Sequence, residues 1–388
     1  MRVLFVTHNF PRREGDHPGS FLLRLARALG DAGVEVLALA PSAPGLAPRE
    51  RLEGIEVERV RYAPAGLETL AYGGDMVSRV KRSLSGAPLL AALLAATAAH
   101  TRSLVRRRAV DLVHAHWWFP SGLAAAWARL PRSTPLVTTL HGSDLRIARD
   151  VAGMRPLFRA VDRASARVAT VSTWLADETA RLLPGREVDV APMPVDVSRF
   201  TPGGPPPADR LLFVGKLDEQ KGSEWLLRAL PLLRTAASLD LVVAAGADEA
   251  PARALAAALG VADRLRWHGQ VAPDTLADLY RGATVVVVPS IEEGLGLVAV
   301  EAQLSGRPVV AFDSGGLRDV VADGETGRLV PPRDPAALAR ALDELLERPD
   351  RGAPLGAEGR RRALERFAPE AAARRHVAIY RAALGLDA

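Results

Sequence analysis

Residues 285–302 read VVVVPSIEEGLGLVAVEA and predict a buried strand, a glycine-containing loop and a helix in direct succession. Four consecutive valines are typical of a strand covered on both faces, as in parallel sheets. Pro289 ends this strand, and Gly294 and Gly296 let the backbone turn sharply before a helix that begins at Leu297. The stretch therefore predicts one strand-to-helix unit of an α/β fold, with a glycine loop at the carboxyl end of the strand.

Short apolar strands alternate with helical patterns along the rest of the chain, which predicts parallel sheets with helices on both faces. Strands are expected at residues 2–7, 34–40, 111–116, 136–140, 168–172 and 188–191, and again at 211–215, 239–245, 285–289, 309–312 and 327–330. The pattern is interrupted where residues 202–207 read PGGPPP. We predict two doubly wound Rossmann-like domains facing each other across a cleft: residues 1–197, a linker at 198–208, and residues 209–368. A last helix, about 369–388, is expected to pack back on the first domain.

Composition excludes several classes of protein. The chain has 388 residues, 48% of them hydrophobic and 24% charged, as in ordinary globular proteins. It has no cysteine, so disulfides and thiolate metal sites are excluded. The net charge of +5 comes almost entirely from arginine, spread along the chain, and predicts no nucleic-acid partner.

One segment raises the question of a membrane. Residues 87–99 read APLLAALLAATAA, between the basic residues Arg79, Lys81 and Arg82 and the run 106–108. The segment is too short to span a bilayer, and we interpret it as an amphipathic surface helix. The alternative is a helix that rests on an anionic membrane surface. The expected location is cytoplasmic, with a membrane-peripheral position as the variant.

Two loops of the second domain contain the strongest candidate ligand-binding residues. The start of the helix after Gly296 is a site for an anionic group such as a phosphate. Glu293 and, two helical turns further on, Glu301 could accept hydrogen bonds from sugar hydroxyls. The other loop, 215–222, reads GKLDEQKG, and its ammonium groups on Lys216 and Lys221 suit a diphosphate.

The first domain offers polar residues after its predicted strands. His141 follows strand 136–140 and can hydrogen-bond a hydroxyl, while Asp144 either lines the site or caps the next helix. His114 and His116 alternate along one strand, which we interpret as pocket lining or strand-end packing rather than as a metal site. Loop 11–20 either closes over a substrate or is a flexible connection.

These motifs resemble those of the retaining GT-B glycosyltransferases of sequence family four, over nearly the whole chain. Four segments carry the resemblance: the two glutamates Glu293 and Glu301 with seven residues between them, GKLDEQKG at 215–222, GGLRDVVADGETGRLVPPRDP at 315–335, and PMPVDVSRF at 192–200. Lys216 stands where arginine is usual, Asp319 where glutamate is common, and Met193-Pro194 where asparagine and glycine are usual.

The resemblance implies a metal-independent, hexosyltransferase-type enzyme with no cofactor that moves a sugar, with retention, from a nucleoside-diphosphate sugar to a hydroxyl acceptor. That acceptor would be a glycan, a lipid-linked glycan or a small molecule. The implied catalytic residues are His141, beside the donor sugar, and Glu293, on its hydroxyls. The implied donor-binding residues are Gly215, Lys216, Lys221, Gly294, Leu295, Gly296, Leu297, Val298 and, on the ribose, Glu301; those on the acceptor side are Gly19, His116 and Asp144.

Three alternatives remain. A sugar-nucleotide isomerase or epimerase of GT-B architecture would need no acceptor. A Rossmann oxidoreductase is disfavoured because the first strand is not followed by GxGxxG. A non-enzymatic sugar-nucleotide binder is disfavoured by His141 and Glu293. Retention itself allows attack from the face of the leaving group or two successive inversions.

Overall fold

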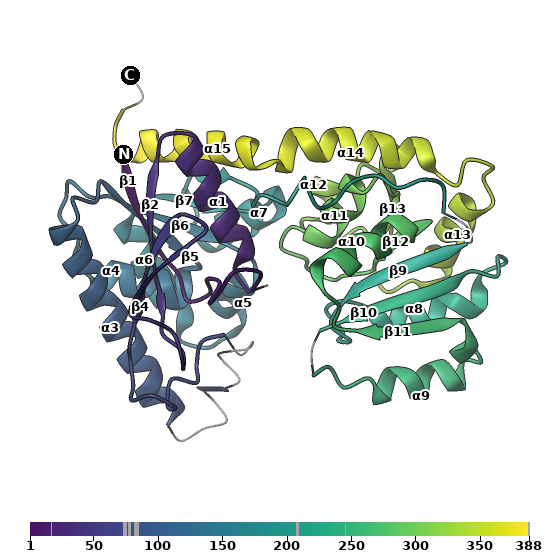
Figure 1. The fold of residues 1–388 in the computed structure, drawn as a ribbon, viewed down its shortest axis with the longest axis horizontal. Coiled ribbons are helices and arrows are strands. Elements are labelled where there is room, and N and C mark those ends of the chain that lie inside the picture. The colour runs from purple at the N-terminus through teal and green to yellow at the C-terminus, as the bar shows by residue number, and fades with distance from the viewer. Residues whose placement is uncertain are drawn as a thin grey trace. The chain divides into compact units, whose positions relative to one another are not determined.

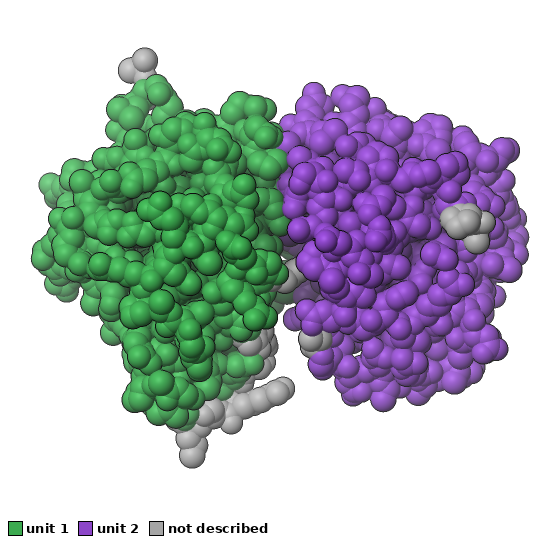
Figure 2. All heavy atoms as spheres, viewed as in Figure 1, with its two compact units in different colours: residues 1–194, 369–388 green, residues 195–368 purple. Residues whose placement is uncertain are grey.

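The computed structural model describes residues 1–16, 18–72, 76, 79–80, 85–206, 209–244 and 246–386. The chain divides into two compact units, residues 1–194 with 369–388 and residues 195–368 (Figures 1 and 2). Each unit is an α/β body with its own sheet, which confirms the predicted fold class. The predicted positions Lys81, Arg82 and 207–208 lie outside the described residues.

In the described part of the chain, the first unit contains an eight-stranded sheet in the order β3-β4-β2-β1-β5-β6-β7-β8. Its strands are β1 Arg2–Val6, β2 Glu35–Pro41, β3 Arg49–Leu52, β4 Ile55–Val60, β5 Leu112–His116, β6 Leu136–Leu140, β7 Ser165–Thr170 and β8 Val188–Val190. All neighbours pair in parallel except β3, which is antiparallel to β4. The sequence pattern did not predict β3 and β4. They form a hairpin through Glu53 and Gly54, both with positive φ, the backbone of a two-residue turn.

Helices cover this sheet and place its loops (Figure 1). They are α1 Ser20–Asp31, α3 Gly86–Arg107, α4 Leu123–Trp127, α5 Ser143–Asp150, α6 Met154–Ala164, α7 Thr173–Leu182 and α15 Pro369–Ala383, with a short π-helical turn, η1, at Trp118–Gly122. Helix α1 buries Leu22, Leu25 and Leu29 at helical spacing. The last helix, α15, belongs to this unit and packs on α1, β6 and β7.

Helix α3 is longer than the predicted segment 87–99. It has 22 residues, with a mean hydropathy of 1.2 over an 18-residue window, so by length and composition alone it could cross a membrane. The predicted surface segment is therefore one part of a longer helix. The helix buries Leu93, Leu94, Leu104 and Val105. It packs on β2, β4 and α4, as a covering helix of an α/β sheet does.

In the second unit, the described residues form a six-stranded parallel sheet in the order β11-β10-β9-β12-β13-β14. Its strands are β9 Arg210–Gly215, β10 Ser238–Val243, β11 Leu265–Gly269, β12 Val285–Val288, β13 Val309–Phe312 and β14 Gly327–Val330. Its helices are α8 Ser223–Ala229, α9 Ala250–Ala258, α10 Pro273–Gly282, α11 Leu297–Leu304, α12 Leu317–Val320, α13 Pro335–Leu346 and α14 Ala353–Phe367, with 3-10 turns η2 at Leu230–Leu232 and η3 at Ala262–Arg264.

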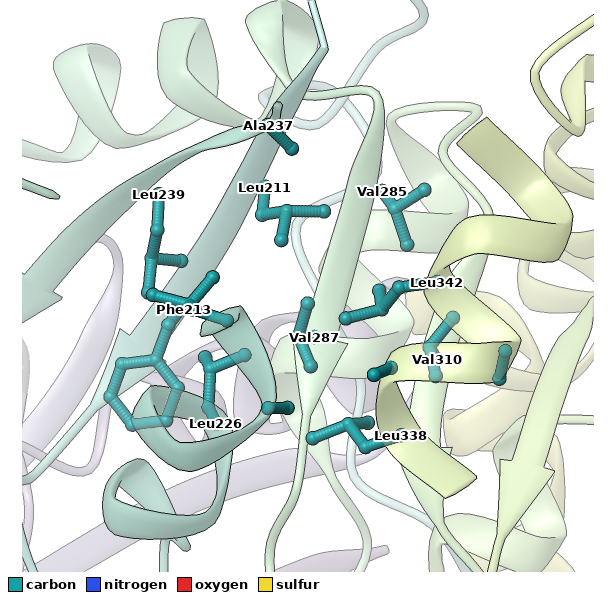
Figure 3. Close-up of a cluster of buried hydrophobic side chains, with 14 of the residues drawn as sticks. Leu211, Phe213, Leu226, Ala237, Leu239, Val285, Val287, Val310, Leu338 and Leu342 are labelled. Atoms are coloured by element: carbon teal, nitrogen blue, oxygen red, sulfur yellow. The ribbon is translucent and has the colours of Figure 1, made fainter. Parts of the chain in front are cut away.

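The core of the second unit lies between its sheet and its helices. All four valines of β12 are at most 5% exposed, as the run of valines predicts. Figure 3 shows Leu338 and Leu342 of α13 directed at Val287 and Val310 of the neighbouring strands β12 and β13. This apolar packing fixes the strands, and with them the loops that leave their carboxyl ends.

The boundary between the units lies after Pro194 rather than at residue 197, and the described part of the predicted linker 198–208 belongs to the second unit. The amide of Val195 donates to the carbonyl of Phe367 at 3.0 Å. The ring of Phe200 packs edge-on against Tyr280, with ring centres 5.4 Å apart. The proline and glycine content of this segment predicted a linker, because composition does not reveal that Phe200 packs against Tyr280.

Candidate functional site

Three neighbouring parallel strands of the second unit, β9, β12 and β13, end at one edge of the sheet, where their loops meet. The amide of Ile291, in the loop after β12, donates to the carbonyl of Gln220, in the loop after β9, at 2.7 Å. Gly222 has a φ of 69°, and a Cβ atom there would lie 1.9 Å from the carbonyl oxygen of Pro289. Only glycine allows the two loops to approach this closely.

Lys221 and Glu293, which the sequence places 72 residues apart, form an ion pair at this junction. The ammonium Nζ of Lys221 lies 2.5 Å from Oε2 of Glu293, and the two side chains are 25% and 15% exposed. The backbone amide of Lys221 also donates to the carboxylate of Asp218 at 2.8 Å. Partial exposure leaves both charged groups within reach of a ligand from solvent, and an anionic ligand would compete with Glu293 for the ammonium.

The loop that carries Glu293 rests on the third loop. The amide of Gly316 donates to the carbonyl of Glu293 at 2.8 Å. A Cβ atom at Gly316 would lie 2.3 Å from the carbonyl oxygen of Gly294. The hydroxyl of Ser314 accepts from the amide of Glu292 at 2.9 Å. These contacts hold the Glu293 backbone in one position, so the Gly315-Gly316 turn supports the site.

Helix α11 begins directly beside the ion pair. Gly296 is its N-cap residue, with a φ of 95°, and Leu295 before it is buried. The first bond within the helix is the one from the amide of Ala299 to Gly296, at 2.9 Å. The preceding amides, those of Leu297 and Val298, therefore lie at the free first turn, where backbone N–H groups and the helix dipole attract anions.

The other predicted donor-binding residues lie at the end of β9 and on α11. Gly215 ends β9, and a Cβ atom there would touch the Lys221 side chain at 3.4 Å, while Lys216 is exposed. The carboxylate of Glu301 on α11 accepts a hydrogen bond from the hydroxyl of Tyr280 at 2.8 Å. Burial and the neighbouring Glu301 carboxylate raise the pKa of Tyr280 well above its usual value, so it remains a donor. Tyr280 was not predicted, because one tyrosine in a helical pattern gives no sign of its partner.

In the first unit, His141 follows β6 and lies among aromatic rings. It stacks on Trp117 with ring centres 4.2 Å apart, and the ring of Phe21 lies 5.5 Å away. Its Nε2 lies 3.3 Å from Nδ1 of His116. Burial, followed by the neighbouring His8 and His376, lowers the pKa of His141 to about 3. His141 is therefore a neutral imidazole at physiological pH, which donates one hydrogen bond from one ring nitrogen and accepts one at the other.

Asp144 is buried, and its carboxylate faces backbone amides. Its side chain is 1% exposed and accepts four backbone N–H bonds. Oδ1 accepts from the amides of His141, Gly142 and Leu145 at 3.0–3.1 Å, and Oδ2 from Trp118 at 3.0 Å. Burial raises the pKa of Asp144 to about 6, while these amides act in the opposite direction. Asp144 thus joins the loops after β5 and β6 and positions His141.

His114 and His116 lie on β5 and are fully buried. His114 bonds Tyr380 of α15 and Thr139 of β6, both at 2.8 Å. Within the described residues, no group of three histidine or carboxylate side chains is placed to hold a metal ion. The side chain of His116 touches His141 and is not exposed.

Gly19 is the N-cap residue of α1 and has a φ of 72°. A Cβ atom there would lie 2.4 Å from the carbonyl oxygen of Asn9, so the loop after β1 folds tightly on itself. Phe21, two residues later, brings this helix end against His141 and Trp117. Gly19 and His141 therefore border the same edge of the first sheet.

Comparison with known families agrees with this geometry. Residues 19–199 match the family described as Glycosyltransferase Family 4, and residues 208–348 match Glycosyl transferases group 1. D-inositol 3-phosphate glycosyltransferase 2 from Catenulispora acidiphila is 32% identical over 91% of this chain and 88% of its own length. D-inositol 3-phosphate glycosyltransferase from Thermobispora bispora is 32% identical over 95% of this chain and 92% of its own length.

Solved structures show the same fold. Sucrose-phosphate synthase from Thermosynechococcus elongatus matches with a TM-score of 0.81 at 24% identity, covering 98% of both chains. Anabaena Alr3699/HepE in complex with UDP-glucose matches with a TM-score of 0.69 at 20% identity, covering 98% of this chain and 99% of that one. The fold is GT-B, and the chain belongs to glycosyltransferase family 4, the group 1 glycosyltransferases.

Proposed function

We propose that this glycosyltransferase uses a nucleoside-diphosphate sugar as donor and transfers the sugar, with retention of configuration, to a hydroxyl group of a polyol or glycan acceptor. The observation that supports this most directly is the contact of Lys221 with Glu293 beside the first turn of α11. It places a cation, a carboxylate and free backbone amides within one small region. A pyrophosphate needs the cation and the backbone amides, and sugar hydroxyls need the carboxylate.

The proposed mechanism divides these groups between the two ends of the donor. The C1–O bond to the diphosphate breaks, and the positive charge that develops at C1 is matched by negative charge on the departing phosphate. Lys221, Lys216 and the amides of Leu297 and Val298 bind that phosphate more strongly as its charge grows, which lowers the barrier. Glu293 accepts from the donor hydroxyls, and Glu301, held by Tyr280, accepts from the ribose.

The first unit supplies the acceptor side in this proposal. His141, neutral and fixed by Trp117 and His116, offers a hydrogen bond to the reacting sugar without adding a charge. The two curated relatives described above are named for D-inositol 3-phosphate, which makes it the first acceptor to test. A cytoplasmic or membrane-peripheral location stays a prediction.

Metal independence is part of the same proposal. Two lysines and a helix end supply the positive charge that a divalent cation supplies in other transferases. Turnover that is unchanged in excess EDTA supports this, and loss of turnover that added Mg²⁺ or Mn²⁺ restores would contradict it.

Calorimetry with UDP, GDP and ADP tests the donor assignment. Lys221→Ala removes a charge-assisted contact worth about 1.5–3 kcal/mol, so we expect about 10- to 100-fold weaker binding of the preferred nucleotide. Arg228→Ala is the matched control, because Arg228 forms an exposed pair with Glu224 on α8. Equal affinity of the Lys221→Ala variant and the wild type would refute the assignment. The anomeric configuration of the product, read by NMR, tests retention.

A further inference from the structure

The first unit contains a small recess beyond the end of β1 that none of the assigned roles uses. His8 and Pro41 line it on the strand side, Leu93 and Leu94 of α3 form an apolar wall, and Ser121 of η1 lies opposite. About 10 Å³ is open to the centre of a water-sized group, so the recess holds one such group.

Two buried polar atoms at this recess have no hydrogen-bond partner among the described residues. They are Nδ1 of His8 and Oγ of Ser121, and Ser121 is 2% exposed. A buried donor or acceptor without a partner is unfavourable, so two of them at one recess call for a polar group between them.

The lining determines what kind of group fits. No aspartate, glutamate, lysine or arginine is found among the described residues that line the recess, so neither an anion nor a cation would find a counter-charge. Burial lowers the pKa of His8 to about 4, which keeps its ring neutral. A hydroxyl group donates one hydrogen bond and accepts others, so it satisfies both Ser121 and either tautomer of His8. The leucine wall suits the C–H groups beside such a hydroxyl.

The recess lies one aromatic ring away from His141. The ring of His8 packs edge-on against Trp117 with centres 4.7 Å apart, and the other neighbour of Trp117 is His141, at 4.2 Å. The recess therefore lies within one ring of the residue to which the proposed function assigns the reacting sugar.

We propose that this recess binds one hydroxyl or hydroxymethyl group of the acceptor, different from the hydroxyl that receives the sugar. The inference rests on the proposed function, since it assigns an acceptor subsite. It makes Ser121 and His8 specificity-determining residues that select acceptors with a hydroxyl at one fixed position.

Ser121→Ala is the test, with Ser165→Ala as the matched control. Ser165 is also buried in the first unit, but its hydroxyl bonds the carbonyl of Val161 and the hydroxyl of Thr138, both at 2.8 Å. With D-inositol 3-phosphate as acceptor, we expect Ser121→Ala to raise the acceptor KM about 3- to 10-fold and to leave the melting temperature unchanged. Ser165→Ala should lower the melting temperature and leave the acceptor KM unchanged. Among monodeoxy analogues of the acceptor, one should give the same KM with Ser121→Ala and the wild type.

Two further readouts separate the inference from the proposed function. Binding of nucleoside diphosphate and slow hydrolysis of the donor without acceptor should be equal in Ser121→Ala and wild type. Saturation-transfer NMR with free myo-inositol should give a weaker signal for Ser121→Ala. If the nucleotide binds but KM and the NMR signal are unaffected by Ser121→Ala, the recess holds only water and the inference is wrong. If the wild type binds no nucleoside diphosphate, the proposed function fails and the inference fails with it.

Discussion

Acidification should destabilise the first unit, because it contains five histidines whose pKa values are lowered by burial: His8, His114, His116, His141 and His376. A lowered pKa in the folded state means that the unfolded chain binds more protons below pH 6.5. The contribution of each histidine to stability is therefore complete above pH 6.5 and is lost as the pH falls towards the folded-state pKa.

His376 gives the magnitude for one site. It is fully buried in α15, and burial lowers its pKa from 6.5 to about 4. Each pKa unit corresponds to about 1.4 kcal/mol, so protonation of this single group costs the fold about 3 kcal/mol. Between pH 6 and 5 the slope approaches about 1.4 kcal/mol per pH unit for each such histidine.

Denaturant unfolding between pH 7.5 and 5, with hydrogen exchange followed separately in peptides of the two units, measures this slope. We expect protection of the first unit to fall much faster than protection of the second. His376→Leu should reduce the slope by about 1.4 kcal/mol per pH unit, because one fewer side chain binds a proton on unfolding. His100→Leu is the control, because His100 makes the same contact with a carbonyl four residues earlier, to Ala96 at 2.9 Å, but is half-exposed. A first unit whose stability is flat over this range, or a slope unaltered by His376→Leu, would refute the reasoning.

Three further substitutions test the positioning of the site. Asp144→Asn turns an amide NH₂ towards one of the four N–H donors, and we expect about 1.5–3 kcal/mol of lost stability and lower turnover with unchanged nucleotide affinity; Asp150→Asn, an exposed change on the same helix, should do neither. Tyr280→Phe removes the hydroxyl that donates to Glu301, so it should weaken nucleotide binding about 3- to 10-fold in calorimetry while the acceptor KM stays constant. An unchanged nucleotide affinity would show that Tyr280 does not position the site. Gly222→Ala should abolish nucleotide binding by separating the loops after β9 and β12, whereas Gly260→Ala, with a similar φ of 67° and nothing within 4 Å of its Cβ, should bind normally.

The convergence of Lys221, Glu293 and the start of α11 was accessible from the sequence because it follows from topology. Parallel strands place all their carboxyl ends at one edge, so a loop after any buried strand is a candidate. The glycines, lysines and glutamates in these loops are then recognisable as candidate ligand-binding residues from their residue types. The close approach of Gly222 to Pro289 brings the two predicted loops together, and no local pattern revealed it.

The sequence did not predict side-chain directions or contacts with partners that are distant in sequence. Asp144 follows a strand, as a ligand-binding residue would, but its carboxylate turns inward to four amides. His116 is on a strand covered on both faces, so its side chain is buried whichever way it points. Tyr280 and Phe200 act through partners on other elements. Periodicity gives the face of an element, but it does not give the rotamer or the residue that meets it.

The two candidate sites differ in the charge of the side chains that form them. The candidate site in the second unit is built from an ion pair, a lysine and a helix end, groups that exchange readily with the charges of a pyrophosphate. The site in the first unit is built from imidazoles that burial keeps neutral, an indole and a hydroxyl. An uncharged hydroxyl placed there exchanges water for equivalent hydrogen bonds, whereas a charged group would lose hydration without gaining a counter-ion. The uncharged first site therefore suits the hydroxyl groups of the proposed acceptor, as the charges of the second suit a diphosphate.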